Sequence, residues 1–355
     1  MKVLITGICG FAGSTLAESL IEHWENIAVC GIDNLVRPGS ETNRRRLTAR
    51  GIEVFHGDIR MASDFEVLPK VDWVIDAAAN PSVLAGINGK GSSRQVLEHN
   101  LASLVNVLEF AKIHRAGFIL LSSSRVYSIR ALAELPLRVA GNAFQLDPLR
   151  PLPPGVSTCG ISPEFSMEPP VSLYGATKLA SETVALDFGI AFDLPVWIDR
   201  CGVLAGPGQF GTPDQGIFSY WVNAHLRRRP LRYIGFEGLG RQVRDAFHPR
   251  DLAVLLVSQM RASRAGGRRV YTAGGGPENA LSLAQVNEWC DTRFGSHAPQ
   301  PDPCPRPYDV PWLVMDNRDA RRDFAWWPRT ALRDILEEIA LHAEAHQDWL
   351  ELSGV

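Results

Sequence analysis

The chain has 355 residues, with 36 basic and 39 acidic side chains and a formal net charge of −3. Because both signs are interspersed, the composition excludes the strongly basic surface of a nucleic-acid-binding protein, and the length predicts two lobes with a large core. No apolar run reaches the length of a membrane span, and no charged leader or apolar signal segment precedes the first strand, so we expect a cytoplasmic protein that contacts no membrane. The six cysteines form no Cys-x-x-Cys pair, which favours reduced thiols.

The first elements predict a turn that binds phosphate. Residues 3–6 form an apolar run typical of a parallel strand buried on both faces. Gly7, Gly10 and Gly13 follow at spacings of three, and an amphipathic helix pattern begins directly after them. Glycines in this context let the backbone approach a pyrophosphate at the helix N-terminus. The pattern predicts a dinucleotide cofactor.

The second strand indicates which dinucleotide is bound. Residues 28–32 lead into Asp33, whose carboxylate would accept hydrogen bonds from the adenosine ribose and repel a 2′-phosphate. Arg37 and the arginines at 44–46 are the counter-argument, since arginines can hold that phosphate. We expect NAD rather than NADP, because the acid lies at the strand tip itself.

Further alternation of strands and helices predicts the fold class. Strands are expected at 53–56, 73–79 and 117–121, with a helix over 96–108 between the last two. This order predicts an α/β, Rossmann-type doubly wound parallel sheet that binds its ligands at the carboxyl ends of the strands. Polar or small residues stand at those ends: Asp33, Asp58, residues 77–80 and residues 122–124.

Tyr174 and Lys178 are the candidate catalytic pair. They lie four residues apart in a helical pattern, so both side chains share one face. An ammonium there stabilises a phenolate, which is a suitable general base for a sugar hydroxyl. Ser123, at the end of the fifth strand, adds a hydroxyl that could bind the same oxygen.

The remaining sequence predicts an irregular insertion, further strands and helices, and no metal site. Residues 128–171 are rich in proline and predict an irregular insertion, which could be a lid, packing decoration or a subunit contact. A strand is expected at 195–200, then a helix through Trp221 and a helix starting at Pro249. His342 and His346 have the spacing of a zinc pair, but no third ligand is suggested nearby, so we expect no metal.

Together, the glycine turn, Asp33, Asn100, Ser123 and the Tyr174–Lys178 pair resemble the extended short-chain dehydrogenase/reductase superfamily, in its nucleotide-sugar branch. Within it, five blocks are similar to CDP-paratose/CDP-tyvelose 2-epimerases: residues 33–35, 39–43, 57–60, 209–216 and 241–245. The chain departs from that subfamily at Val203, Ala205 and Gly208, which are expected near the sugar.

The resemblance implies a set of binding residues. Cofactor-binding residues would be Gly7, Gly10, Phe11, Ala12, Gly13, Asp33, Asn34, Asp58, Ile59, Ala77, Ala78, Ala79, Asn100, Tyr174 and Lys178. Substrate-binding residues would be Asn80, Ser124, Arg125, Arg200, Gln209, Gln215, Arg244 and Arg306, the last two suited to a pyrophosphate.

The resemblance also implies an activity and a domain organisation. It implies an NAD-dependent epimerase that oxidises a CDP-linked deoxyhexose to a transient ketone and returns the hydride at C2. A UDP-hexose-type 4-epimerase and a non-catalytic NAD-binding protein remain as alternatives. Residues 1–199 with about 242–272 would form the NAD-binding Rossmann domain, and about 200–241 with 273–355 the smaller nucleotide-sugar lobe. A homodimer or homotetramer is expected.

Overall fold

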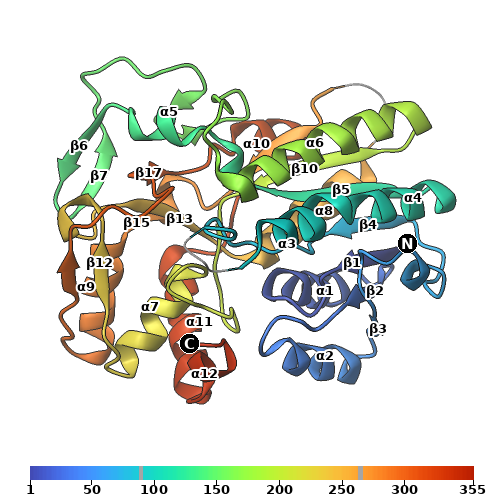
Figure 1. Cartoon of the computed structure of the whole chain (residues 1–355), viewed down its shortest axis with the longest axis horizontal. Helices are drawn as coiled ribbons and strands as arrows, with labels where there is room; N and C mark the ends of the chain where they lie inside the picture. The colour runs from blue at the N-terminus through green and yellow to red at the C-terminus, as the bar shows by residue number, and fades with distance from the viewer. Residues whose placement is uncertain (88–90, 263–266) are drawn as a thin grey trace. The chain divides into compact units, whose positions relative to one another are not determined.

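The computed structural model describes residues 1–87, 91–262 and 267–355. The chain divides into two compact units (Figure 1). Unit 1 comprises Met1–Val126, Leu173–Arg200 and Pro249–Tyr271, and unit 2 comprises Tyr127–Ser172, Cys201–His248 and Thr272–Val355. The expected boundaries differ from these at residues 127–172 and 242–248, which group with unit 2.

Unit 1 is built on a parallel sheet whose inner strands, such as β4 and β10, are buried on both faces. Across the described residues the sheet has seven strands in the order β14-β10-β5-β4-β1-β2-β3. The strands are β1 (Lys2–Thr6), β2 (Ala28–Asp33), β3 (Glu53–His56), β4 (Trp73–Asp76), β5 (Gly117–Ser123), β10 (Val196–Cys201) and β14 (Val270–Ala273). On β1, Val3 pairs with Val29 of β2 on one side and with Trp73 of β4 on the other. This arrangement confirms the doubly wound α/β fold.

Helices cover this sheet, and α1 packs against both α2 and α8. Apolar side chains such as Leu4, Val74 and Phe118, all essentially inaccessible to solvent, form the core between sheet and helices. The helices of unit 1 are α1 (Phe11–His23), α2 (Ser40–Ala49), α3 (Ser93–Leu97), α4 (Leu104–His114), α6 (Ser172–Phe192) and α8 (Pro249–Arg261), with 3-10 turns η1 (Ala62–Phe65) and η3 (Ser124–Val126).

Two elements of unit 1 differ from the expectation. The helix expected over 96–108 is interrupted by a π-helical turn, η2 (Glu98–Ala102), which separates α3 from α4. The fourth strand ends at Asp76 rather than Ala79. There the Ala78 N–H donates to the hydroxyl of Thr6 at 3.1 Å, so a side chain takes the place of the backbone ladder.

Unit 2 has a small sheet centred on β13 (Val243–Phe247). This strand pairs in parallel with β11 (Val203–Leu204) and β17 (Trp312–Leu313) and antiparallel with β15 (Ala280–Ser282). Helix α7 (Ile217–Leu226) packs against α9 (Leu283–Phe294) and α11 (Leu332–Ala345) over a core that includes Trp221. The remaining elements are β12 (Arg232–Ile234), β16 (Gln300–Asp302), α10 (Arg318–Phe324), α12 (Trp349–Leu352), and 3-10 turns η4 (Phe236–Gly238) and η5 (Pro277–Asn279).

The segment expected to be irregular is more ordered than predicted. Residues 127–172 contain α5 (Ile129–Ala133) and two hairpins, β6 (Leu137–Ala140) with β7 (Ala143–Leu146) and β8 (Val156–Ser157) with β9 (Gly160–Ile161). The Phe144 N–H donates to the carbonyl of Arg241, and the Ile161 N–H donates to the carbonyl of Val314. These bonds attach the segment to unit 2, which explains why it does not belong to the Rossmann domain. The strands are short and the segments that flank them contain proline, so no alternation was visible in the sequence.

Two general properties of the chain accompany this fold. No helix among the described residues is long and apolar enough to cross a membrane. All six cysteine residues are free thiols.

Asp245 of β13 is buried in unit 2 among glycines. Its Oδ2 accepts the N–H groups of Gly276 and Met315 at 3.0 and 3.1 Å. A Cβ on Gly274 would lie only 2.4 Å from that oxygen, so the glycine is required for this enclosure. Burial raises the pKa of Asp245 to about 7, although the N–H donors oppose the shift.

Asp245 therefore predicts a pH dependence of stability. The folded state holds the proton more tightly than the unfolded chain, so this contribution is full below about pH 4 and is lost as the pH rises to about 7. Asp245→Asn should make the free energy of unfolding less dependent on pH over this range. Asp199, whose pKa burial also raises to about 7, keeps its own contribution. Urea denaturation at pH 5 and pH 8 measures the difference, and the exposed Asp187→Asn is the control. An unchanged slope in Asp245→Asn would contradict the assignment.

Candidate active site

The glycine turn has the shape of a phosphate cradle. Gly7 has φ +64°, and a Cβ there would lie 2.8 Å from the Cα of Ala78. A Cβ on Gly13 would lie 2.3 Å from the carbonyl oxygen of Gly7. Helix α1 begins at Phe11, and its N-cap Gly10 provides no side-chain cap. The N–H groups of its first turn, from Phe11 to Gly13, are thus available to phosphate oxygens, which fits the predicted pyrophosphate.

Asp33 is fixed at the tip of β2. Its Oδ2 accepts the Cys9 N–H and its Oδ1 accepts the Leu35 N–H, both at 2.8 Å. Burial raises the pKa of Asp33, and backbone N–H groups including that of Gly10 oppose this shift. The carboxylate therefore lies against the glycine turn, as a ribose-binding acid must.

The predicted neighbours of Asp33 are brought together with it. Asn34 donates from Nδ2 to Oδ2 of Asp58 at 3.1 Å, which links the tips of β2 and β3. The Arg60 guanidinium, together with the bond from Asn34, lowers the pKa of Asp58. Ile59, beside Asp58, packs in part against the core of unit 1 and gives its carbonyl to Asn106.

The arginines at 44–46 are paired with acids of their own surroundings. Arg44 and Arg45 lie 3.7 and 3.8 Å from the carboxylate of Glu41, and Arg46 lies 3.3 Å from that of Glu18. Asn43 of the same helix donates to the carbonyl of Cys9 at 2.9 Å and so attaches helix α2 to the glycine turn. This role of Asn43 was not predicted from the sequence, although the residue lies within one of the blocks that carried the resemblance.

Asn100 connects the β4 tip to helix α6. Its Oδ1 accepts the Asn80 N–H at 2.7 Å, and its Nδ2 donates to the carbonyl of Asn80 at 3.0 Å and to the hydroxyl of Thr177 at 3.3 Å. The π turn η2 carries Asn100, and such turns are frequent at functional sites. The structure thus shows a positioning role for Asn100, while its contact with a cofactor stays a prediction, as it does for Ala77, Ala78 and Ala79.

The three predicted catalytic residues all belong to unit 1. Lys178 is 2% exposed and donates from Nζ to the carbonyl of Leu121 on β5 at 3.0 Å. Tyr174 lies one helical turn before it on α6 and is 8% exposed. Ser123 ends β5, and its Oγ accepts the Arg125 N–H at 3.1 Å. Because that oxygen already accepts a bond, the hydroxyl hydrogen of Ser123 is left to donate to a ligand.

A buried ion pair lies beside this trio. Glu182, one turn after Lys178, accepts from the Ser122 hydroxyl and from the guanidinium of Arg200 at 2.7 Å. The Glu182 and Arg200 side chains are each 4% exposed. Arg200 was predicted to bind substrate, but this pairing gives it a structural task that ties α6 to β10. Glu182 had not been singled out, and its helical spacing from Lys178 was the available signal.

Two of the arginines predicted to bind substrate lie close together in unit 2. Arg244 donates to Oδ1 of Asp309 at 2.8 Å, and Arg306 donates to Oδ1 of Asp214 at 2.7 Å. Burial lowers the pKa of Arg244; the nearby charge of Arg306 adds to this shift, and Asp309 opposes it. The two guanidiniums are thus near enough for their charges to interact, and each is already paired with a carboxylate.

The loop after β11 is held by the C-terminal helix. The carbonyl of Gln209 accepts from Trp349 Nε1 at 2.9 Å, and Phe210 stacks on the Trp349 ring at 5.1 Å between centroids. The side chain of Gln209 turns inward and donates to the carbonyl of Leu204, while Gln215 and Thr212 close the loop by mutual backbone bonds. Trp349 is therefore a positioning residue for this loop that the sequence analysis did not find.

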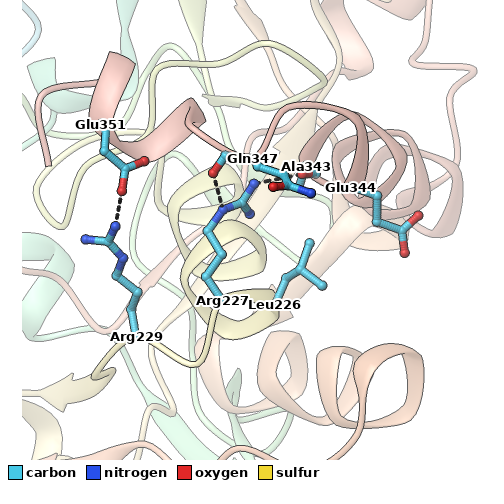
Figure 2. A pocket seen from close by; sticks show the side chains of 7 residues that line it. All are labelled: Leu226, Arg227, Arg229, Ala343, Glu344, Gln347 and Glu351. Carbon is cyan, nitrogen blue, oxygen red and sulfur yellow. Dashed lines mark hydrogen bonds and ion pairs between the residues drawn. The ribbon is translucent and has the colours of Figure 1, made fainter.

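Figure 2 shows a pocket in unit 2 whose lining includes none of the predicted site residues. It is lined by Leu226, Arg227, Arg229, Ala343, Glu344, Gln347 and Glu351. Arg227 donates to the carbonyls of Ala343, His346 and Gln347, so its charge caps the C-terminus of α11. Arg229 pairs with Glu351. These polar groups serve the packing of α7 against α11 and α12.

Comparison with known proteins gives a consistent result. The model of the NAD dependent epimerase/dehydratase family matches residues 3–274. The chain is 26% identical to CDP-paratose 2-epimerase of Salmonella typhi over 358 residues, covering 96% of this chain and 98% of that protein. It is 22% identical to UDP-glucose 4-epimerase of Corynebacterium glutamicum over 349 residues, covering 95% and 94%.

Solved structures share the fold. UDP-glucuronic acid 4-epimerase from Bacillus cereus, in complex with UDP-glucuronic acid and NAD, matches with a TM-score of 0.78 at 22% identity. The match covers 97% of this chain and 99% of that one. UDP-glucose 4-epimerase from Thermus thermophilus, in complex with NAD, matches with a TM-score of 0.71 at 22% identity over 97% and 99%.

The fixed carboxylate of Asp33 predicts the cofactor preference. NAD should bind more tightly than NADP, and Asp33→Asn should reduce the difference mainly by weakening NAD, because a charged acceptor for the ribose hydroxyls is lost. Protein fluorescence titration with both dinucleotides measures this. A preference for NADP that Arg37→Gln or Arg45→Gln reverses would instead assign the ribose site to the arginines.

Proposed function

This chain belongs to the NAD dependent epimerase/dehydratase family, and we propose that it epimerises a nucleotide sugar, at C2 of a CDP-linked deoxyhexose. The observation that carries the reaction class is the trio of unit 1: Lys178 fixed on the carbonyl of Leu121, Tyr174 one turn before it, and Ser123 with its hydroxyl hydrogen left to donate.

The residues of the chain divide the chemistry among them. The first turn of α1 would hold the pyrophosphate of NAD and Asp33 its adenosine ribose, and bound NAD supplies the acceptor and donor of hydride at the sugar carbon. Tyr174, as the phenolate, takes the proton of the sugar hydroxyl, and the ammonium of Lys178 stabilises that phenolate. Ser123 donates to the same sugar oxygen and stabilises its developing charge.

The residues after Ser123 favour epimerisation over dehydration. Elimination of water requires an acid/base pair, for which the related dehydratases carry Asp and Glu directly after the serine. Here Ser124 and Arg125 occupy those positions, and Ser124 is only 5% exposed. Neither side chain provides a carboxyl proton.

The nucleotide end of the substrate is assigned to unit 2. Arg244 and Arg306 would share the two negative charges of the diphosphate, and planar guanidiniums suit this task. The choice of a CDP-sugar is supported by the residue blocks resembling 2-epimerases and by the identity with CDP-paratose 2-epimerase along the whole chain.

Two of the positions at which the chain departs from the 2-epimerase pattern are constrained by packing or by backbone conformation. Ala205 is fully buried in the core of unit 2, and its N–H donates to the carbonyl of Phe247. Gly208 has φ +75°, a conformation that a larger residue adopts with strain. These departures therefore alter packing and backbone shape, and they leave the proposed roles of Arg244 and Arg306 intact.

A 4-epimerase is the second candidate, since relatives that share this fold are named as acting on UDP-glucose or UDP-glucuronic acid at C4. The same trio of residues serves either carbon, so the position of the reacting carbon needs its own experiment.

Substitutions of the trio test the reaction class. Tyr174→Phe should abolish turnover and leave NAD binding nearly intact, because only the proton-transfer group is removed. Ser123→Ala should lower kcat by about 10²-fold, the usual effect of losing a positioned donor. Turnover is measured with a panel of CDP-, UDP-, GDP- and dTDP-sugars. Substantial activity in Tyr174→Phe would show that another base operates, and wild-type protein that binds NAD but converts none of these sugars would favour a non-catalytic role.

Isotope labelling tests the reacting carbon. A CDP-deoxyhexose deuterated at C2 should keep its label in the epimerised product, because the hydrogen that leaves C2 returns to it. The reaction in deuterium oxide should leave C2 unlabelled, as mass spectrometry and NMR can show. Solvent deuterium at C2 or C3 would indicate deprotonation instead, and inversion at C4 would assign the protein to the 4-epimerases.

A further inference from the structure

Asp76 is a buried carboxylate near Lys178, the proposed catalytic lysine. Asp76, the last residue of β4, is 6% exposed, and its Oδ1 accepts the hydroxyl of Thr6 at 2.5 Å. Its register partner on β5 is Leu120, and the next residue, Leu121, gives its carbonyl to Nζ of Lys178. The ammonium of Lys178 therefore binds β5 one residue beyond the position that pairs with Asp76.

Asp76 lies near enough to Lys178 for the positive charge of the lysine to act on its carboxyl group. Burial raises the pKa of Asp76, while the positive charge of Lys178 and the bond from Thr6 lower it. Of the two groups that lower the pKa of Asp76, Lys178 is the charged one, since Thr6 is neutral. Removing a buried charge from water is costly unless an opposite charge or hydrogen bonds compensate it. Each of these two residues thus supplies part of what the other requires.

The same contact reaches the cofactor turn. Thr6 immediately precedes Gly7, and its hydroxyl oxygen accepts the N–H of Ala78 while its hydrogen goes to Asp76. Asp76 is consequently connected to the glycine turn through Thr6 and to helix α6 through Lys178.

We propose that Asp76 is the buried counter-ion of Lys178 and a positioning residue, which holds the ammonium where it serves Tyr174 and the cofactor ribose. The catalytic part of this inference rests on the proposed function. The electrostatic part depends only on the fold of unit 1 and can be measured without a nucleotide sugar.

A double-mutant cycle tests the electrostatic part. Asp76→Asn and Lys178→Met should each lower the thermal unfolding midpoint by several degrees, because each leaves an uncompensated buried charge. The double variant should lose clearly less than the sum of the two shifts. The control cycle pairs Lys178→Met with Asp245→Asn, a buried carboxylate of unit 2, and should be additive. Additive shifts in the Asp76–Lys178 cycle would overturn the proposal.

NAD binding and kinetics test the positioning part. Asp76→Asn should weaken NAD binding in fluorescence titration and lower kcat by up to about 10²-fold with little change in KM, because the ammonium is no longer held in place. Asp187→Asn, at an exposed carboxylate outside the proposed site, should change neither quantity. An Asp76→Asn variant with wild-type NAD affinity would refute the positioning role even if Lys178→Met fails to fold. A positive cycle and weakened NAD binding, without turnover of any nucleotide sugar, would support this inference and count against the proposed function.

Discussion

The polar face that helix α6 presents to the sheet is the constraint on which the site of unit 1 depends. Along this face, Lys178 donates to the Leu121 carbonyl, Ser181 donates to the Asn100 carbonyl at 3.0 Å, and Glu182 accepts from Ser122 and Arg200. These α6 residues are at most 3% exposed. A buried polar group without a partner costs free energy, so the helix has one favourable register against β5 and β10. Tyr174 begins the same face, and its position follows from this register.

The two units handle negative charge differently. The proposed phosphate sites use neutral N–H groups of a helix N-terminus in unit 1, whereas in unit 2 they use Arg244 and Arg306, each already bonded to a carboxylate. Those acids keep the guanidiniums oriented and satisfied without a ligand. They also cancel the local charge, which explains why a chain with a net charge of −3 gives no sign of an anion site in its bulk composition.

The fold could be predicted, and the catalytic trio could be proposed, because their determinants are local in sequence. The spacing of Gly7, Gly10 and Gly13, the apolar strands and the Tyr174–Lys178 interval each follow from the geometry of one element. What sequence reasoning missed depends on contacts between distant elements. The π turn at Asn100 exists where its amide bridges Asn80 and Thr177, and a helical period cannot show this. The hairpins within 127–172 are stabilised by partners that lie about a hundred residues or more away, such as Arg241 and Val314. The ion pair of Arg200 with Glu182 was also missed, because Glu182 lies in another element.

The enclosure of the glycine turn has an evolutionary consequence. Gly7 and Gly13 are constrained by the Ala78 backbone and by the Gly7 carbonyl, both of which belong to the protein itself. Selection for folding alone would therefore preserve these glycines in a duplicated gene whose product had ceased to bind a dinucleotide. The hydroxyl of Tyr174, by contrast, has no hydrogen-bond partner within the described part of the chain. In homologues that no longer catalyse the reaction, Tyr174 should therefore be substituted first, whereas the spacing of the glycines should be retained.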